Sequence, residues 1–327
     1  MSLAMLASLM ASAVAAPFVF KMLVAMKSRQ NVSAHLAEHA HKQGTPTMGG
    51  IIVLIGLLTG MACTWRAEYL GVLVLVLGFA AVGFADDFLV PKMKPGSRGL
   101  HWAPKLGLEI GAAVGAAFLT GWNDPVQMGV FVFLVLFLSN AYNFSDGLDT
   151  LAGGLGVILS AGLALIVIFP PMAGLGTKLV TELSTPLSTQ YSIVIICSSL
   201  LVSFLPFLYL NSPPARVFMG DVGALPIGAV LAWIASMLLL PTGDPTVNIS
   251  LSNLFPLAVL FGVMIAEIIP PPLQVFWVKV FKKRLFNFKT PIHHAFQEKG
   301  WPETRIVWLF HVVQAGLVVL ALGMIWL

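Results

Sequence analysis

Charge and cysteine are scarce in this sequence. Only 10% of its 327 residues are Asp, Glu, Lys or Arg, 58% are hydrophobic, and the mean hydropathy is +0.91. Soluble globular domains carry about 25% charged residues, so this composition argues against that class and indicates an integral membrane protein. Cys63 and Cys197 both lie in apolar runs. We therefore expect two small core side chains rather than a disulfide framework or a thiolate metal site, and no nucleic-acid partner.

The first apolar stretch lacks a basic residue in front of it. It runs from Met1 to Phe20, and the first charge is Lys21. A secretory signal peptide has a positively charged region ahead of its apolar core. We therefore expect a retained membrane helix here, with a cleaved signal peptide as the alternative.

Apolar segments fill most of the remaining chain. A helix needs roughly 20 apolar residues to cross a bilayer. On that measure residues 1–327 form a single polytopic, all-α membrane domain without a soluble domain. We expect about ten transmembrane helices, near residues 2–26, 47–65, 69–88, 104–121, 126–144, 151–170, 191–210, 222–240, 253–277 and 305–327. Prolines in IIPPPLQ, residues 268–274, should break or kink the ninth helix because they remove backbone donors.

The distribution of Lys and Arg predicts the orientation of these helices. If the segments alternate in direction, one face receives all 18 Lys and Arg residues except Arg66 and Lys178. By the positive-inside rule that face is cytoplasmic, so both termini are expected outside. The basic stretch KVFKKR, residues 279–284, could serve topology alone or hold anionic lipid head groups.

Polar residues are concentrated in five segments on the predicted cytoplasmic face. These are HAHKQGTPTMGG (39–50), ADDF (85–88), NAYNFSDGLDTLAGG (140–154), NSPPARVFMGDVG (211–223) and TPIHHAF (290–296). They contain the aspartates Asp86, Asp87, Asp146, Asp149 and Asp221. Carboxylates gathered in a partly dry site either take up protons or bind a cation, and oxygen ligands of this kind suit Mg²⁺. The segments are therefore expected to form one active site on the cytoplasmic face.

Each of these residues also has a purely structural interpretation. Asp146 could cap a helix, and if the helix begins there, Asp146 and Asp149 share one face. Asp221 in FMGDVG could belong to a simple turn, although the neighbouring glycines allow close approach to a ligand. His293 and His294 could be solvated loop residues or could contact phosphate. GTPTMGG lacks the spacing of a P-loop and is weak as a generic motif.

Taken together, the segments resemble a known family. In their order and spacing, GTPTMGG, the DD pair, NAYNFSDGLDTLAGG, PARVFMGD and PIHHAF with GWPE are similar to polyprenyl-phosphate N-acetylhexosamine-1-phosphate transferases. The likeness runs from about Lys42 to the last helix. The members most similar to it imply transfer of phospho-MurNAc-pentapeptide from UDP-MurNAc-pentapeptide to undecaprenyl phosphate, giving lipid I and UMP. They also imply Mg²⁺ as cofactor, the bacterial inner membrane as location, and a homodimer.

The resemblance also implies roles for individual residues. Asp86, Asp87, Asp221, His293 and His294 match catalytic positions, with Asp221 and Asp87 as Mg²⁺ ligands. Asp86 and Asp87 would serve the lipid phosphate or the metal, and since a phosphate acceptor is already ionised at pH 7, we expect positioning rather than obligatory proton removal. Phe218 is a candidate to stack on uracil. The substrate-binding positions are Lys42, Thr45, Lys105, Asn140, Asn143, Asp146, Gly147, Asp149, Asn211 and Phe218.

The chain departs from the family pattern at Val90, Ala295 and Gln297, where relatives usually carry Lys, His and Glu. Two alternative functions follow from the same residues. One is a sister transferase that uses UDP-GlcNAc. The other is a cation transporter, which would need acidic residues near the middle of the bilayer, where Glu109 is the clearest instance and Glu267 lies nearer the cytoplasmic half.

Overall fold

The computed structural model describes residues 1–26, 44–94, 99–169, 187–240 and 251–326, without the side chains of residues 251 and 252. All regular elements in these ranges are helices, which confirms the predicted all-α class. Helices satisfy their own backbone hydrogen bonds, as a chain in lipid requires. The elements are α1 (Ser2–Ala25), α2 (Ile51–Cys63), α3 (Tyr69–Phe84), η2 (Ala85–Leu89), α4 (Val90–Met93), α5 (Trp102–Thr120), α6 (Pro125–Phe144), α7 (Leu151–Ile168), α8 (Leu187–Asn211), α9 (Asp221–Leu239), α10 (Leu251–Leu260), α11 (Gly262–Ile268), α12 (Pro270–Phe281), α13 (Ile292–Glu298) and α14 (Glu303–Trp326).

Eight stretches of the described residues are long and apolar enough to cross a membrane. They are Ser2–Ala25, Tyr69–Met93, Pro125–Phe144, Leu151–Ile168, Leu187–Asn211, Asp221–Leu239, Gly262–Phe281 and Glu303–Trp326. Of the two other predicted spans, α2 is a helix of 13 residues, and α5 has 19 residues but is not among the eight. The protein is thus a multi-pass membrane protein, and the count of ten spans stays a prediction.

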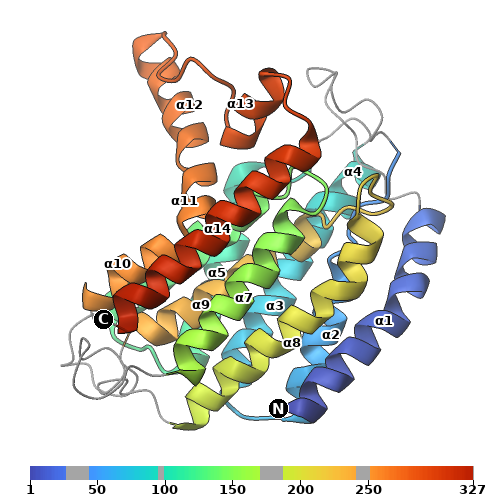
Figure 1. The fold of residues 1–327 in the computed structure, drawn as a ribbon, viewed down its shortest axis with the longest axis vertical. Helices are drawn as coiled ribbons and strands as arrows, with labels where there is room; N and C mark the ends of the chain where they lie inside the picture. Colours follow the sequence, from blue (N-terminus) through green and yellow to red (C-terminus); the bar gives the residue numbers. More distant parts are fainter. Residues whose placement is uncertain (27–43, 95–98, 170–186, 241–250, 327) are drawn as a thin grey trace.

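Helix α9 forms the centre of the bundle. Every residue from Val222 to Leu239 is buried, and the helix packs against α3 and α6. Helices α1, α2 and α8 form a neighbouring group, while α7 packs against α8 and α14, as Figure 1 shows. Gly50 and Gly223 let α2 approach the start of α9, because a Cβ on either glycine would overlap the backbone of the other. This close packing fixes the first turn of α9, where Asp221 lies.

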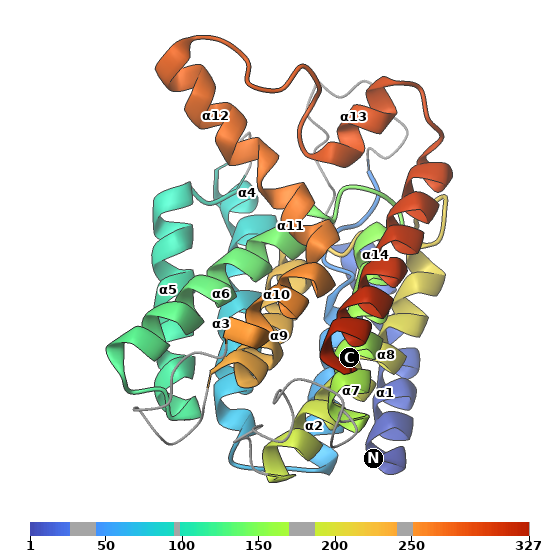
Figure 2. The ribbon, with the colours of Figure 1, turned by 60° about the vertical axis from the view of Figure 1, so that its left-hand side comes forward.

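The helices alternate in direction, so their ends gather at two opposite ends of the bundle. Figures 1 and 2 show both chain termini in the lower half, with α4 and α13 at the upper end. The upper end also carries the last turns of α6 and α8 and the first turns of α7 and α9. The described parts of the five polar segments therefore meet at one end, as the alternation predicted.

The ninth predicted span is interrupted at two places, whereas the prolines predict one. Helix α11 ends at Ile268 and α12 begins at Pro270, so a new helix starts within the proline run. Ile269 keeps right-handed helical angles, φ −65° and ψ −47°, and the chain therefore stays helical through the junction. A second interruption at Phe261 separates α10 from α11. In Figure 2, α12 projects beyond the bundle, and Pro270 is its one buried residue.

The cysteine prediction was half wrong. Cys197 is buried in α8, as expected for a small core side chain. Cys63 is exposed at the end of α2. An apolar run does not by itself bury all its residues, because one side of a membrane helix can face lipid.

Candidate active site

The adjacent aspartates Asp86 and Asp87 lie in η2, a π-helical turn between α3 and α4. Asp86 Oδ1 accepts a hydrogen bond from Leu100 N at 2.6 Å, at the approach to α5. Asp87 Oδ2 accepts one from Val222 N at 3.2 Å, in the first turn of α9. Single π-turns inside α-helices are frequent at functional sites. Here the pair contacts two different helices, so the two carboxylates hold different positions in the site.

Lys105, in the first turn of α5, links the turn η2 to the start of α9. Its Nζ lies 3.3 Å from Asp86 Oδ2 and 2.5 Å from Asp221 Oδ2. Asn143 Nδ2, from the last turn of α6, donates to Asp221 Oδ1 at 2.7 Å. The side chains of Lys105, Asp86 and Asp221 are 19%, 16% and 21% exposed, so a ligand can reach charges that the bundle holds in place. Asp86, Lys105, Asn143 and Asp221 are called the carboxylate cluster below, together with Asp87.

Negative charge exceeds positive charge in this cluster. Asp87 interacts electrostatically with Asp86, Asp146 and Asp221, while Lys105 is the cation that contacts Asp86 and Asp221. Within the described ranges, no three Asp, Glu, His or Cys side chains are grouped as a ready metal site. Mg²⁺ commonly takes one or two protein carboxylates and completes its shell with water and substrate phosphates. The oxygen donors and the excess negative charge therefore fit Mg²⁺ bound together with a phosphate substrate.

The loop between α6 and α7 carries Asp146, Gly147 and Asp149. Asp146 Oδ2 accepts from Gly220 N at 3.2 Å. Asp149 Oδ2 accepts from Ala215 N at 2.9 Å, and its own N–H donates to Glu303 Oε1 at 2.7 Å. Helix α7 begins at Leu151 with Thr150 at its N-cap position, so Asp146 does not cap this helix, and the condition under which Asp146 and Asp149 would share a helix face is not met. Instead, Asp146 and Asp149 tie the loop to the segment before α9 and to α14.

Asn211 performs a similar structural task at the end of α8. Its Oδ1 accepts from Thr150 N at 2.8 Å, and its Nδ2 donates to Val217 O at 2.8 Å. Thr150 has a left-handed backbone, φ 65°, which Asn211 helps to hold. Asn211 is 4% exposed and Asp149 is 5% exposed. Both residues therefore build the loop from within, and their predicted contact with substrate stays a prediction.

The GTPTMGG segment runs beside Phe218. Phe218 N donates to Pro46 O at 2.8 Å, and Gly49 N donates to Phe218 O at 2.7 Å. Thr45 and Phe218 are both half-buried. At the end of this pairing Gly220, with φ +71°, lies so close to Thr47 and Asp87 that a Cβ would overlap both side chains. The pairing therefore connects the segment around Thr45 to the carboxylate cluster.

The two histidines lie on α13 and differ in their surroundings. His293 is 1% exposed, and its Nδ1 lies 2.6 Å from Glu267 Oε2 of α11. His294 is half-buried, with Nδ1 2.8 Å from Gln297 Oε1, so the departure at Gln297 supplies a partner for this ring. His293 Nε2 faces Gly147. Glu267 is not among the predicted site residues. The signal that could have identified it was an acidic residue inside an apolar span.

Asn140, a predicted substrate position, lies deeper in the bundle than the carboxylate cluster. Asn140 is one turn before Asn143 on α6, and its Nδ2 donates to Glu109 Oε2 at 3.2 Å. Glu109 is buried in α5. Lys42 lies outside the described residues. The structure thus brings Asp86, Asp87, Lys105, Asn143, Asp146 and Asp221 together, and it places Asn140 deeper in the bundle.

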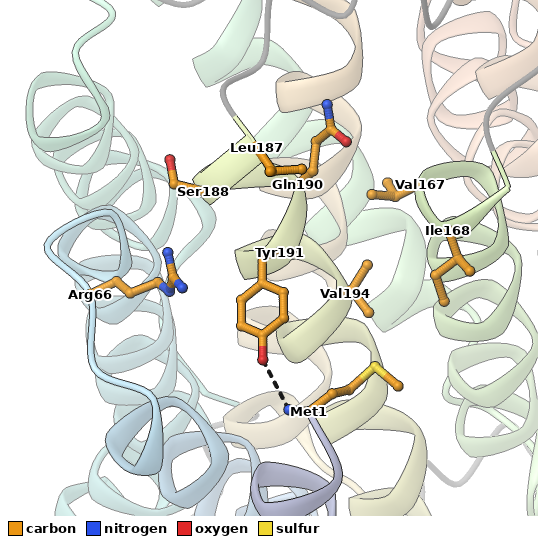
Figure 3. Close-up of a pocket in the computed structure, with 9 residues that line it drawn as sticks. All are labelled: Met1, Arg66, Val167, Ile168, Leu187, Ser188, Gln190, Tyr191 and Val194. Atoms are coloured by element: carbon orange, nitrogen blue, oxygen red, sulfur yellow. Dashed lines mark hydrogen bonds between the residues drawn. The ribbon is translucent and has the colours of Figure 1, made fainter.

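A separate cavity of about 540 Å³ lies at the end of the molecule where the chain starts. Met1, Arg66, Leu187, Tyr191 and Val194 are among its lining residues, and Figure 3 shows the Met1 nitrogen beside the Tyr191 hydroxyl. It contains none of the predicted site residues. The carboxylate cluster, with its convergent charged and amide groups, is the better candidate for the active site.

Fold and site together define a polytopic membrane protein whose helix ends gather carboxylates, a lysine and amides where phosphate chemistry can take place. The profile described as Glycosyl transferase family 4 matches residues 69–239, and the phospho-N-acetylmuramoyl-pentapeptide-transferase signature 1 matches residues 42–54. The chain belongs to the phospho-N-acetylmuramoyl-pentapeptide-transferase family.

Individual relatives with this name are similar to the chain over most of its length. The phospho-N-acetylmuramoyl-pentapeptide-transferase of Acinetobacter baylyi is 32% identical over 363 residues, covering 98% of this chain and 91% of the relative. That of Neisseria meningitidis serogroup A is 33% identical, with coverage of 98% and 91%. That of Granulibacter bethesdensis is 35% identical, with coverage of 85% and 78%. At 98% coverage, the similarity to the Acinetobacter and Neisseria relatives includes the elements that contribute to the carboxylate cluster.

Proposed function

We propose that this protein transfers phospho-MurNAc-pentapeptide from UDP-MurNAc-pentapeptide to undecaprenyl phosphate, giving lipid I and UMP. Family membership supports the reaction class and the signature over residues 42–54 supports this donor. The observation that carries the site assignment is the contact of Lys105 with both Asp86 and Asp221 at one end of the bundle. One substrate is a soluble polyanion and the other a phosphate on a membrane-embedded tail, so a site at a membrane face serves both.

The cluster suits phosphoryl transfer, in which the protein mainly positions groups and balances charge. Lys105 supplies a cation to phosphate oxygens, and Asn143 holds Asp221 in its orientation by donating to Oδ1. When bound, Mg²⁺ would be held by Asp221 and Asp87 and would neutralise the diphosphate. Asp86, tied to Leu100 and Lys105, orients the acceptor side of the site. The acceptor phosphate is already ionised at pH 7, so Asp86 and Asp87 act by positioning.

We further propose the bacterial inner membrane as location, with the carboxylate cluster on the cytoplasmic face, both termini outside, and a homodimer as assembly. Both termini lie in the half of the molecule opposite α4 and α13 (Figures 1 and 2), which supports an even number of crossings. The excess of Lys and Arg on the cluster's face supports the assignment of that face to the cytoplasm.

One assay tests the function. Purified protein is incubated with Mg²⁺, undecaprenyl phosphate and either UDP-MurNAc-pentapeptide or UDP-GlcNAc, and UMP release is measured. We expect release with the muramoyl donor and its loss when EDTA removes the metal. Absence of UMP with both donors contradicts the transferase proposal, and release with UDP-GlcNAc alone contradicts the donor assignment.

A further inference from the structure

Glu267 is a fully buried carboxylate inside the apolar α11. It is 0% exposed, and it accepts two hydrogen bonds from one residue of α13. His293 N lies 3.1 Å from Oε1, and His293 Nδ1 lies 2.6 Å from Oε2. Burying a carboxylate destabilises the fold unless hydrogen-bond donors satisfy its oxygens. Both oxygens of Glu267 are thus used to hold the backbone and the ring of His293.

This arrangement determines which nitrogen of His293 is free. With Nδ1 against Glu267, Nε2 points to Gly147 in the loop between α6 and α7, where a Cβ on Gly147 would overlap the ring. Nε2 is buried and has no hydrogen-bond partner among the described residues. Gly147 directly follows Asp146, which contacts the segment before α9. An unsatisfied nitrogen is therefore directed at the predicted donor-binding loop.

We propose that Glu267 is a positioning residue for the reaction: it holds the Nδ1–H of His293, so that Nε2 is the nitrogen that meets a phosphate oxygen of the donor beside Gly147. A carboxylate that is hydrogen-bonded to one ring nitrogen of a histidine fixes the tautomer and the orientation of the ring. Glu267 also balances the positive charge of the ring whenever Nε2 carries a proton toward an anionic oxygen. The inference rests on the proposed transferase function and concerns a residue that does not itself touch substrate.

The two donors on Glu267 make Glu267→Gln an informative substitution. Glutamine has nearly the same volume, but its amide offers one oxygen acceptor and one NH₂ donor. The backbone N–H and the Nδ1–H of His293 both need an acceptor, and the amide supplies only one. Either its NH₂ group faces one of these two donors, or the ring proton moves from Nδ1 to Nε2. An opposed donor turns the ring away from Gly147, and a ring with its proton on Nε2 has lost the carboxylate that balances its charge when it faces a phosphate oxygen. In both cases catalysis weakens although the fold is preserved.

The experiment compares Glu267→Gln, His293→Asn and the double variant in the purified full-length protein, using UMP release from UDP-MurNAc-pentapeptide. Asparagine retains a donor for Glu267 and removes Nε2. We expect Glu267→Gln to lower kcat by about 10- to 100-fold with KM changed by less than about threefold. A loss of this size is typical when the group that orients a functional histidine is removed. Because both act through Nε2, the double variant should be within about threefold of His293→Asn.

Two further variants separate positioning from packing. Glu68→Gln makes the same chemical change at the opposite end of the bundle, where Glu68 Oε2 accepts from Ser192 Oγ at 2.7 Å, and its kcat should be unchanged. Glu267→Asp keeps both acceptor oxygens but leaves a small void. Positioning predicts higher kcat for Glu267→Asp than for Glu267→Gln, whereas a packing role predicts the reverse order. If Glu267→Gln unfolds, Glu267→Asp alone decides the question: a folded but inactive Glu267→Asp overturns positioning.

The outcomes are distinct. If the wild-type protein releases no UMP, the proposed function fails. If the wild-type protein is active and Glu267→Gln keeps more than half of kcat, or if the losses in the double variant multiply, the positioning role of Glu267 is overturned.

Discussion

The carboxylate cluster and the Glu267–His293 pair lie at the same end of the bundle but are constructed differently. The cluster draws on η2, α5, α6 and α9, and the side chains of Asp86, Lys105 and Asp221 keep 16% to 21% exposure. The pair joins α11 and α13 and is almost completely buried, at 0% and 1% exposure. Charges that bind phosphates must remain accessible, whereas a residue that only orients a ring functions best without water. The comparison predicts that the cluster supplies most of the free energy of substrate binding, whereas the pair mainly orients the His293 ring.

The largest effect is expected from Asp221→Ala. This substitution removes a predicted metal ligand and leaves Lys105 and Asn143 without their shared partner, so kcat should fall by roughly 10³-fold. UMP release at saturating Mg²⁺ measures it. Asp124→Ala is the control: Asp124 caps α6 at the other end, and its loss should cost about 1 kcal/mol of stability with kcat unchanged. Retention of a tenth of the activity by Asp221→Ala would remove it from the metal site.

Lys105→Met should have the next largest effect. Without the ammonium group, Asp86 and Asp221 repel each other and phosphate oxygens lose a cation, so kcat/KM should fall by about 10²-fold. Steady-state kinetics with varied UDP-MurNAc-pentapeptide measure the loss. Lys21→Met, which removes an exposed lysine of α1, is the matched control and should match the wild type. Equal kinetics for the two variants would show that Lys105 only balances the carboxylates.

Gly147→Ala tests the buried pair with a smaller change. The added methyl group would overlap His293 Nε2, so the ring must turn or the loop must shift. We expect kcat to fall by about tenfold. Gly129→Ala on α6 is the control, because its Cβ meets open space, and it should stabilise the helix by about 0.5–1 kcal/mol. Unchanged kcat in Gly147→Ala would show that the position of Nε2 does not matter to the reaction.

Much of the fold and part of the site can be predicted from local sequence. Long apolar runs predict helices, and alternation of direction places Asp86, Asp146 and Asp221 at one end. The limits of the helices were harder to predict. The start of α7 at Leu151 depends on Asn211 holding the left-handed Thr150, a contact between residues 61 positions apart. The break at Phe261 carries no proline signal of its own.

The sequence by itself determined the membrane class, the all-helical architecture and the family, because hydropathy and closely spaced motifs are local properties of the chain. Only the tertiary structure decided which side chains meet. It joined Lys105 to Asp221 across 116 positions and Glu267 to His293 across 26, and it turned His293 Nε2 toward Gly147. Such pairings depend on which helices pack together and in what rotation. Those arrangements follow from the burial of the whole bundle around α9 rather than from any single segment.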